Sequence, residues 1–385
     1  MSRPIRHVCI VEYFGHYEVA EGMAGALDRS GVRVSLLVDA AFTATLLGPE
    51  WRNNRRFYAH PAPDLWTALS EQQPLLASAD LIVFTTIAGQ WRRLATYPYL
   101  SKSVWVMHNL HNLLGSRIAW GAKAWYRYWR YAGPAARRLA AHIGYLTFPN
   151  RAMRAYAIDR LGSPPARLFP VPPLVGVPTH PPASLGEGGA LRIVVPGTVD
   201  SELRDVGPLL GAVRRLASAG TKVDLVFAGR NKLSGLEKRL ASLPAGVSYR
   251  MYQRTLDRGE YYEQLRRGHV WVLPVRSRPL VRWCREEWGR SKVSGVWQDW
   301  LREGRPLLAS TAYHLPPELA TIIPSYSGAA ELFRHLVALT EAHYREEWME
   351  RAYIARVTYL RQEWDQFRLH WEKWQLRPPS TFAHE

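Results

Sequence analysis

Short apolar runs recur along the chain, and each is followed by a stretch with helical periodicity. In the first half the runs cover residues 7–12, 33–38, 81–86, 103–109 and 144–149. After residue 190 the pattern starts again, at 191–197, 223–229, 247–253, 269–275 and 306–310. Buried strands that alternate with helices are typical of parallel βαβ units. The pattern therefore predicts an α/β chain with two successive parallel sheets.

A segment rich in proline and glycine separates the two series of strands. It covers residues 169–190 and breaks both helix and strand periodicity. A length of 385 residues also favours two domains. We expect a first domain over 1–175, a linker over 176–190, a second domain over 191–350, and C-terminal helices over 351–385 that cross back to the first domain.

The composition narrows the functional classes. With 50 basic and 33 acidic residues the net charge is +17, which favours a polyanionic partner such as a phosphorylated substrate, an anionic membrane or nucleic acid. The two cysteines, Cys9 and Cys284, have no paired spacing, so a reducing compartment is expected. The apolar run at 7–14 is too short for a signal peptide and is expected to be a strand, and no run of about 18 apolar residues occurs in the sequence. These features predict a cytoplasmic location.

In parallel sheets, ligands bind beyond the carboxyl ends of the strands. That rule places four polar pairs along one rim of the first domain: Gly15-His16, Thr85-Thr86, His108-Asn109 and Pro149-Asn150. No G-x-G-x-x-G pattern follows the first strand, so a dinucleotide cofactor is not expected. Two interpretations stay open for His16 and for His108. Each histidine contributes to a cleft, or it serves only as a solvated, capping or core residue.

Residues 286–310 read as a loop, a helix and a short buried strand. We expect the helix to open at Ser291 or Lys292, with Ser294 and Gly295 in its first turn, and to end at Gly304. A helix start gathers unpaired N–H groups and the positive end of the macrodipole. Lysine, serine and glycine at that place predict an anion site, most simply for a phosphate.

The same segment resembles the donor-binding signature of GT-B glycosyltransferases, above all the large retaining nucleotide-sugar family 4 (glycosyl transferases group 1). That signature is E-x-F-G, a helix with a second acid, and G-x-P before an apolar strand. Here 286–289 read EEWG and 304–306 read GRP, with Asp299 at the second acid. This acid is Asp rather than Glu, and the family spacing of seven residues between the acids lands on Ser291.

The resemblance implies a GT-B fold, in which two Rossmann-like α/β/α domains face each other across a cleft. It implies donor contacts from both domains, with Asp299 at the ribose and Lys292, Ser294 and Gly295 at the phosphates. The other donor-binding positions it implies are Gly15, His16, Gly197, Thr198, Arg204, Gly229 and Arg230. For the reacting sugar it implies His108, with Glu286 or Glu287.

The activity implied by the resemblance is transfer of a sugar from a nucleotide-diphosphate donor to a saccharide or lipid-linked acceptor. The transfer would retain configuration, use no metal and need no cofactor. Envelope polysaccharide or glycolipid synthesis would be its setting. Three alternatives stay open: a catalytically silent GT-B scaffold, an epimerase or phosphorylase on the same fold, and a nucleic-acid-binding protein. The last has only charge and aromatic content in its favour, because no known motif appears, so no nucleic-acid partner is expected.

Residues 116–138 form the most unusual segment of the first half. On a helical wheel, Ile118, Ala122, Trp125 and Trp129 share one face, and basic residues share another. Pro134 is expected to kink or break the helix. Such a segment suits the interface of an anionic bilayer, and an ordinary amphipathic helix with its tryptophans in the core is the alternative. We expect the tryptophan face to pack inside and the basic face to meet a membrane.

Overall fold

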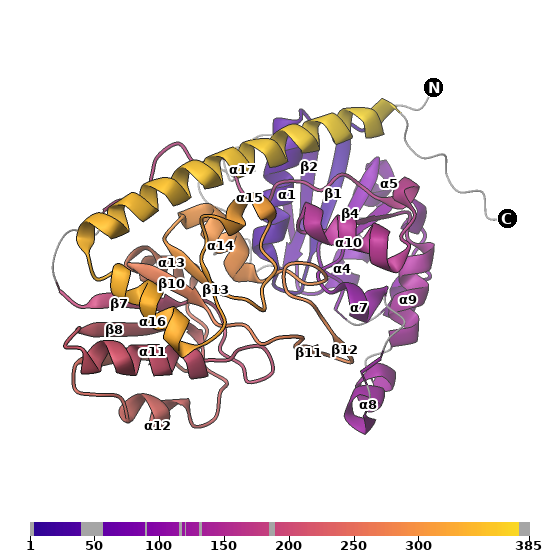
Figure 1. Cartoon of the computed structure of the whole chain (residues 1–385). Helices are drawn as coiled ribbons and strands as arrows, with labels where there is room; N and C mark the ends of the chain where they lie inside the picture. Colours follow the sequence, from indigo (N-terminus) through magenta and orange to yellow (C-terminus); the bar gives the residue numbers. More distant parts are fainter. Residues whose placement is uncertain are drawn as a thin grey trace.

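The computed structural model describes residues 4–39, 57–88, 91–114, 118–119, 121–130, 133–184 and 189–376. These residues form two α/β domains that lie side by side (Figure 1). Each domain contains a six-stranded sheet in which every pairing is parallel. The α/β prediction from the alternating apolar runs is thus confirmed.

The first sheet has the strand order β3-β2-β1-β4-β5-β6. Its strands are β1 (His7–Glu12), β2 (Arg33–Asp39), β3 (Phe57–Ala62), β4 (Leu81–Phe84), β5 (Ser103–Val106) and β6 (Tyr145–Thr147). The helices of this domain are α1 (Tyr17–Arg29), α4 (Leu65–Glu71), α5 (Gln73–Ser78), α6 (Trp91–Leu94), α7 (Leu110–Leu113), α8 (Ala122–Arg130), α9 (Gly133–His142) and α10 (Arg151–Leu161). β1, β4 and β5 are buried along their whole length, as their continuous apolar runs predict.

The second sheet has the order β14-β13-β10-β7-β8-β9. Its strands are β7 (Leu191–Val195), β8 (Val223–Arg230), β9 (Val247–Tyr252), β10 (Val270–Leu273), β13 (Leu307–Ser310) and β14 (Ser325–Tyr326). Its helices are α11 (Gly207–Ser218), α12 (Leu236–Ala241), α13 (Arg258–Arg266), α14 (Gly295–Glu303), α15 (Pro317–Ala320) and α16 (Ala329–Ala338). Renumbered within each domain, both sheets follow the Rossmann order 3-2-1-4-5-6.

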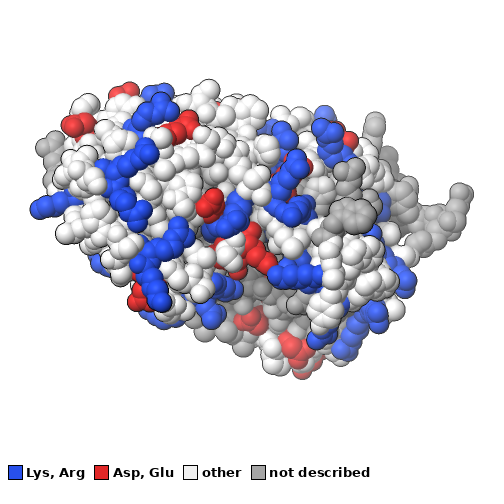
Figure 2. Space-filling model, turned by 60° about the horizontal axis from the view of Figure 1, so that its bottom comes forward, with Lys and Arg blue, Asp and Glu red and all other residues white. Residues whose placement is uncertain are grey.

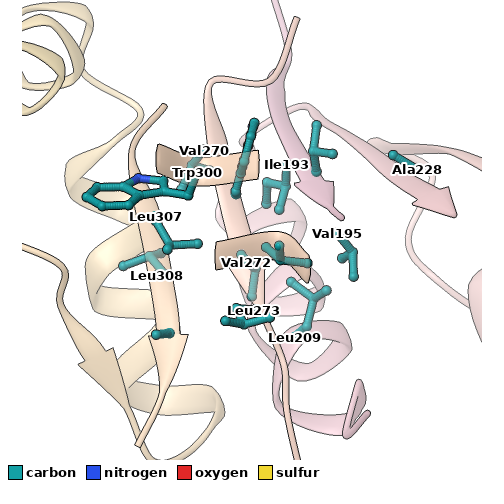
Figure 3. Close-up of a cluster of buried hydrophobic side chains, with 14 of the residues drawn as sticks. Ile193, Val195, Leu209, Ala228, Val270, Val272, Leu273, Trp300, Leu307 and Leu308 are labelled. Atoms are coloured by element: carbon teal, nitrogen blue, oxygen red, sulfur yellow. The ribbon is translucent and has the colours of Figure 1, made fainter. Parts of the chain in front are cut away.

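The core of the second domain fixes the position of α14. Trp297 and Trp300 of this helix are buried and stacked, with ring centroids 5.3 Å apart. Figure 3 shows Trp300 beside Val270 and Leu307, which belong to the central strands β10 and β13. The indole N–H of Trp300 donates to the carbonyl of Arg305 at 2.8 Å, so its one polar group is satisfied inside the core. The buried face of α14 leaves its first residue free to face the neighbouring domain.

One long helix, α17 (Ala342–Leu376), runs along both domains (Figure 1). Its N-terminal part places Trp348 and Leu360 in the core of the second domain. Its C-terminal part places Phe367 and Trp371 in a core of the first domain, where Trp371 also packs against Phe169. The helix therefore ties the two domains together through apolar contacts at both of its ends.

A second connection is made by the loop before α14, which we call the arm (276–292). It contains the small hairpin of β11 (Leu280–Val281) and β12 (Cys284–Arg285). Trp283 at the hairpin turn is fully buried in the first domain, where its ring meets Trp91 and Tyr128 edge-on. A side chain of that size contributes roughly 2–3 kcal/mol when fully buried. The arm thus anchors the second domain in the first.

Helix α8 extends outward from the first domain (Figure 1). Three of its aromatic residues are largely exposed: Trp125 at 47%, Tyr126 at 66% and Trp129 at 67%. The expectation that its tryptophans pack in the core is therefore wrong. Ala124 and Tyr128 form the buried face instead, because Tyr128 fits against Trp283 of the arm. The sequence could not show that partner, which lies 155 residues further along the chain.

The charge surplus does not gather on one patch of the face shown in Figure 2. Basic side chains are spread over that face, and acidic side chains lie between them. Among the described residues, no helix is both long and apolar enough to cross a bilayer.

Candidate functional site

Helix α14 begins at Gly295, three or four residues later than expected. Ser294 is its N-cap residue, with extended backbone and no side-chain capping bond. The preceding residues form a tight turn, in which the N–H groups of Ser291 and Lys292 both donate to the carbonyl of Glu287. The carbonyl of Ser291 is also taken by the N–H of Leu110 in the first domain, at 2.9 Å. This contact between domains competes with helix formation and delays the helix start.

At its other end, α14 stops as the sequence predicts. Gly304 is the C-cap residue in a left-handed conformation, with φ of 68°. A side chain at this position would be strained, and it would also meet the guanidinium of Arg356 on α17. The helix is therefore held at a fixed length between the arm and the strand β13.

A cavity of about 410 Å³ lies at the junction of the two domains. From the first domain it is lined by residues that follow β1, β5 and β6, including His16, Glu18, His108, Asn109 and Pro149. From the second domain it is lined by Gly197, Thr198, Arg204, Tyr261, Trp288, Lys292, Ser294, Gly295, Gln298 and Asp299, among others. The volume is that of an ordinary small-molecule site. Most of the donor-binding positions expected from the sequence therefore share one cavity.

Two cations line the second-domain side of this cavity, the buried Arg204 and the half-buried Lys292. Arg204 is only 6% exposed, and its guanidinium donates to the carbonyl of Pro196 at 3.3 Å while its Nη1 has no partner. Burial lowers the pKa of Arg204 to about 10, so it stays charged at neutral pH. Lys292 donates to Asn109 Oδ1 at 2.8 Å. Neither cation is paired with a carboxylate in the part of the chain that the structure describes.

The ammonium of Lys292 is sensitive to its surroundings. Burial lowers the pKa of Lys292 to about 8; Glu286 opposes this shift, whereas Arg282 and Arg204 add to it. Glu286 therefore offsets only part of the cost of holding this ammonium away from water. Together with the free first turn of α14, the two cations make an environment suited to a phosphate group.

Asp299 lies on α14 at the cavity, and both of its oxygens have a tyrosine partner. Tyr261 donates to Oδ2 at 2.7 Å and Tyr262 to Oδ1 at 3.0 Å. Burial raises the pKa of Asp299 to about 6, although the two hydroxyls and Arg302 favour the carboxylate. Each carboxylate oxygen can accept a further hydrogen bond. The tyrosines thus orient an acid that can still meet a hydroxyl group.

The first-domain side of the cavity carries two stacked histidines. The rings of His16 and His108 lie 4.3 Å apart with an angle of 13° between their planes. His108 Nε2 lies 2.8 Å from the carbonyl of Thr85, so this nitrogen carries the proton. Burial lowers the pKa of His108 to about 3, with the neighbouring His16 adding to the shift. His108 is therefore a neutral ring that supports His16.

Glu286 is fully buried and does not line the cavity. Its carboxylate accepts from the N–H and side-chain amide of Asn112 at 3.1 and 3.0 Å, and from the hydroxyl of Ser291 at 2.5 Å. The N–H of His111 lies 3.3 Å away. Burial raises the pKa of Glu286 to about 7, opposed by these donors and by Lys292. The structure places this acid at the junction of the arm with α7, where it joins the two domains.

Glu287 points to a different part of the first domain. It accepts from the hydroxyl of Tyr156 at 3.2 Å and lies 3.7 Å from Arg290. It does not line the cavity either. Thus neither acid of the EEWG motif faces the space in which a donor sugar would lie.

Three of the expected donor contacts also lie outside the cavity lining. Gly15 forms a left-handed turn with φ of 91°, and Arg230 is exposed at the end of β8. Gly229 packs against another backbone segment: a Cβ there would lie 2.2 Å from the carbonyl carbon of Gly197. Gly229 therefore shapes the floor under Gly197 and Thr198, which do line the cavity.

Sequence reasoning missed Glu18, which lines the cavity from the first turn of α1. Its Oε1 lies 3.5 Å from His16 Nδ1. Burial favours the protonated acid, but the interaction with His16 outweighs it and holds the pKa of Glu18 below its usual value. An acid in a first helical turn is common, so its type alone gave no signal. Its spacing of two residues from a histidine at the strand rim was the available hint.

The comparisons with known proteins support the fold. No family model matches the chain, and no match was found among curated proteins. Among solved structures, the chain is similar to WaaG, a glycosyltransferase involved in lipopolysaccharide biosynthesis, with 14% identity, a TM-score of 0.52 and coverage of 90% of this chain and 94% of that one.

Two further structures show the same likeness. A glycosyltransferase from Rickettsia africae ESF-5 has 8% identity, a TM-score of 0.53, and coverage of 99% of this chain and 100% of its own. A putative UDP-N-acetylglucosamine 2-epimerase from Listeria monocytogenes has 13% identity, a TM-score of 0.52, and coverage of 89% and 90%. The chain has the GT-B fold expected from its sequence, and this fold carries more than one chemistry.

Proposed function

We propose that the protein transfers a sugar from a nucleotide-diphosphate donor to a saccharide or lipid-linked acceptor. The observation that carries this proposal is a pair of cations beside the start of α14, the buried Arg204 and the half-buried Lys292, which form no salt bridge with any carboxylate of the described residues. An anion with two phosphate groups supplies the missing counter-charge. The cavity between two Rossmann-type domains leaves space for a sugar next to it.

The diphosphate is the leaving group of this reaction, and its charge grows as the anomeric bond breaks. Fixed cations and N–H groups that face the developing charge stabilise the transition state more than the ground state. We assign this task to Arg204, Lys292 and the N–H groups at Ser294 and Gly295, without a metal ion. A ribose hydroxyl would donate a hydrogen bond to Asp299, whose carboxylate is oriented by the hydroxyls of Tyr261 and Tyr262.

The acceptor hydroxyl can lose its proton in two ways, which differ in the anomeric configuration of the product. Retention of configuration, which the sequence resemblance implies, passes the proton to the departing phosphate and needs no side-chain base. Inversion needs a base on the acceptor side of the sugar. The cations line the second-domain side of the cavity and the histidines line the first-domain side. The configuration of the product distinguishes the two mechanisms.

Helix α8 is the part of the chain that we propose to meet a membrane that holds the acceptor. Its exposed aromatic residues are Trp125, Tyr126 and Trp129, and Lys123 and Arg130 of the same helix are also exposed. Aromatic rings favour the headgroup region, and each basic residue near an anionic surface contributes about 1 kcal/mol. We expect peripheral binding to envelope membranes, which suits lipid-linked acceptors.

Liposome flotation tests the membrane contact. The wild-type protein should float with anionic vesicles at low salt, and the double variant Trp125→Ser/Trp129→Ser should float several-fold less. A matched control replaces Tyr344 and Leu369, which are similarly exposed on α17. Equal flotation of all three proteins, or none for the wild type, would contradict the assignment of α8.

The proposed activity is tested with a thermal-shift panel of nucleotide sugars and nucleoside diphosphates, followed by a transfer assay with the best donor. A ligand that binds only the folded state must raise the melting temperature.

The transfer rate of Lys292→Ala should be at least about tenfold lower than that of the wild type, since one charge-assisted hydrogen bond contributes about 1.5–3 kcal/mol. Lys238→Ala on the exposed side of α12 is the control. Full activity of Lys292→Ala would contradict the assignment of Lys292 to the phosphate. Donor binding by the wild type without any transfer would favour a catalytically silent scaffold.

A further inference from the structure

Helix α1 of the first domain presents an acid to the second domain. The buried face of the helix, which includes Val19 and Met23, packs in a core of the first domain. Gly22 lies so close to the backbone of Leu174 that a Cβ there would clash with its carbonyl oxygen, which fixes the helix against that segment. This packing turns Glu21 toward the second domain, where its side chain is only 15% exposed.

Two arginines of the second domain hold Glu21. Arg258 at the start of α13 donates from Nη2 to Glu21 Oε2 at 2.7 Å. Arg302 Nη2, on α14, lies 3.8 Å from the same oxygen. A partly buried ion pair is screened much less than an exposed one, so Glu21 can set the direction of the Arg302 side chain. These contacts join the two domains independently of the arm.

Arg302 connects this contact between domains to the acid of the cavity. Its Nη1 donates to the hydroxyl oxygen of Tyr262 at 2.5 Å, and that hydroxyl donates to Asp299 Oδ1 at 3.0 Å. A tyrosine hydroxyl has one proton to give and can accept a hydrogen bond at the same time. Burial alone would lower the pKa of Arg302. The pKa is nevertheless raised, by Tyr262 and then by the carboxylates of Glu21 and Asp299.

Glu21 lies outside the cavity, whereas Asp299 lines it. Any effect of Glu21 on a bound ribose must therefore pass through Arg302 and Tyr262. An acceptor binds a hydroxyl selectively only when its direction is fixed by its neighbours. For Asp299, one of the groups that fix this direction belongs to the other domain, so the affinity for ribose depends on the contact between the domains.

We propose that Glu21 of the first domain is a positioning residue that orients Asp299 toward the ribose of the donor. Arg302 and Tyr262 transmit the effect. By linkage, a ribose bound to Asp299 strengthens the contact of Glu21 with the second domain, so donor binding and domain contact favour each other. This inference rests on the proposed function, in which Asp299 meets the ribose of a nucleotide-sugar donor.

Calorimetry with two ligands tests the inference: the nucleoside diphosphate that gives the largest thermal shift, and its 2′,3′-dideoxy form, which lacks both ribose hydroxyls. The wild type should prefer the first by at least about tenfold, since a hydroxyl meets a charged acceptor. Glu21→Gln keeps the side-chain shape and removes the charge, so it should reduce this preference by at least about threefold. Glu202→Gln is the matched control and should keep the wild-type preference. Its carboxylate also joins the domains, through Lys123 and Arg127 of α8.

The preference compares two ligands on one variant, so a change in the folded fraction cancels from it. In an Asp299→Asn background, Glu21→Gln should cause no further change in preference, because the two residues act in one chain. Equal preference in the wild type and Glu21→Gln, an equal loss in Glu202→Gln, or a further loss in the Asp299→Asn background would overturn the role of Glu21. A wild type that binds both ligands equally would also overturn it. A wild type that binds neither ligand would instead contradict the proposed function, on which the inference rests.

Discussion

The two sides of the cavity differ in chemistry although their sheets share one topology. The second-domain side offers Arg204, Lys292 and the start of α14, which are cations and N–H groups. The first-domain side offers two stacked imidazole rings, His16 and His108, and the carboxylate of Glu18. In each case the strand rim provides the position and the loop residues provide the chemistry. Two copies of one architecture can therefore be given separate tasks in a single reaction.

The arm is where these two sides meet. Lys292 belongs to the second domain but is bound to Asn109 of the first, and Glu286 holds the N–H groups of α7. The geometry of the cationic side thus depends on a contact with the other domain. The acid that the motif suggests for the sugar is used in this structure to hold the domains together.

The largest effect is expected from breaking this junction. Glu286→Gln replaces an acceptor by an amide whose NH₂ faces hydrogen-bond donors, so the free energy of unfolding should fall by about 2–3 kcal/mol at pH 8. Because burial raises the pKa of Glu286 to about 7, the folded state binds its proton more tightly than the unfolded state does. The free energy of unfolding of the wild type should therefore fall as the pH rises from about 5 to about 8. The loss on substitution is read from urea unfolding. Glu287→Gln is the control, and an equal loss there would contradict the special role of Glu286.

A smaller effect is expected from removing one cation of the second-domain side. Arg204→Met keeps much of the side-chain volume and removes a charge that is costly to bury, so the fold should not be weakened. The affinity for a nucleoside diphosphate should fall by about 10–100-fold, which corresponds to about 1.5–3 kcal/mol. Calorimetry measures it, with the exposed Arg230→Met as the matched control. If only Arg230→Met lowered the affinity for the diphosphate, the phosphate site would instead lie at the end of β8.

The smallest effect is a dependence on pH. The pKa of Lys292 is lowered to about 8, so the cation is present below this pH and is lost above it. Diphosphate affinity should therefore begin to fall near pH 8 and then drop by up to about tenfold per pH unit. Lys292→Arg should flatten this profile, because a guanidinium stays charged. A profile in Lys292→Arg as steep as that of the wild type would assign the titration to another group.

Much of the fold could be predicted from the sequence. The strands β4 and β10 are continuous apolar runs, and such runs mark buried parallel strands whatever surrounds them. The end of α14 at Gly304 was also predictable, since left-handed backbone at that position favours glycine. Both signals are local, so a single sequence is enough to reveal them.

The site depended more on contacts between distant residues. The start of α14 is displaced because Leu110 binds the carbonyl of Ser291, and Glu286 is buried because Asn112 lies beside it. The contact of Glu18 with His16 becomes recognisable as part of the site only once the fold places both residues at the cavity. The exposure of Trp125 and Trp129 follows from the fit of Tyr128 to the arm. No local pattern contains these partners.

The central claim is that the second-domain side of the cavity binds a diphosphate. One calorimetric series tests it most directly, with a nucleoside, its monophosphate and its diphosphate titrated into the wild type and into the double variant Arg204→Met/Lys292→Ala. We expect the wild type to bind the diphosphate at least about tenfold more tightly than the nucleoside, and the double variant to lose this difference. Equal affinity of the wild type for nucleoside and diphosphate, or an unchanged preference in the double variant, would contradict it.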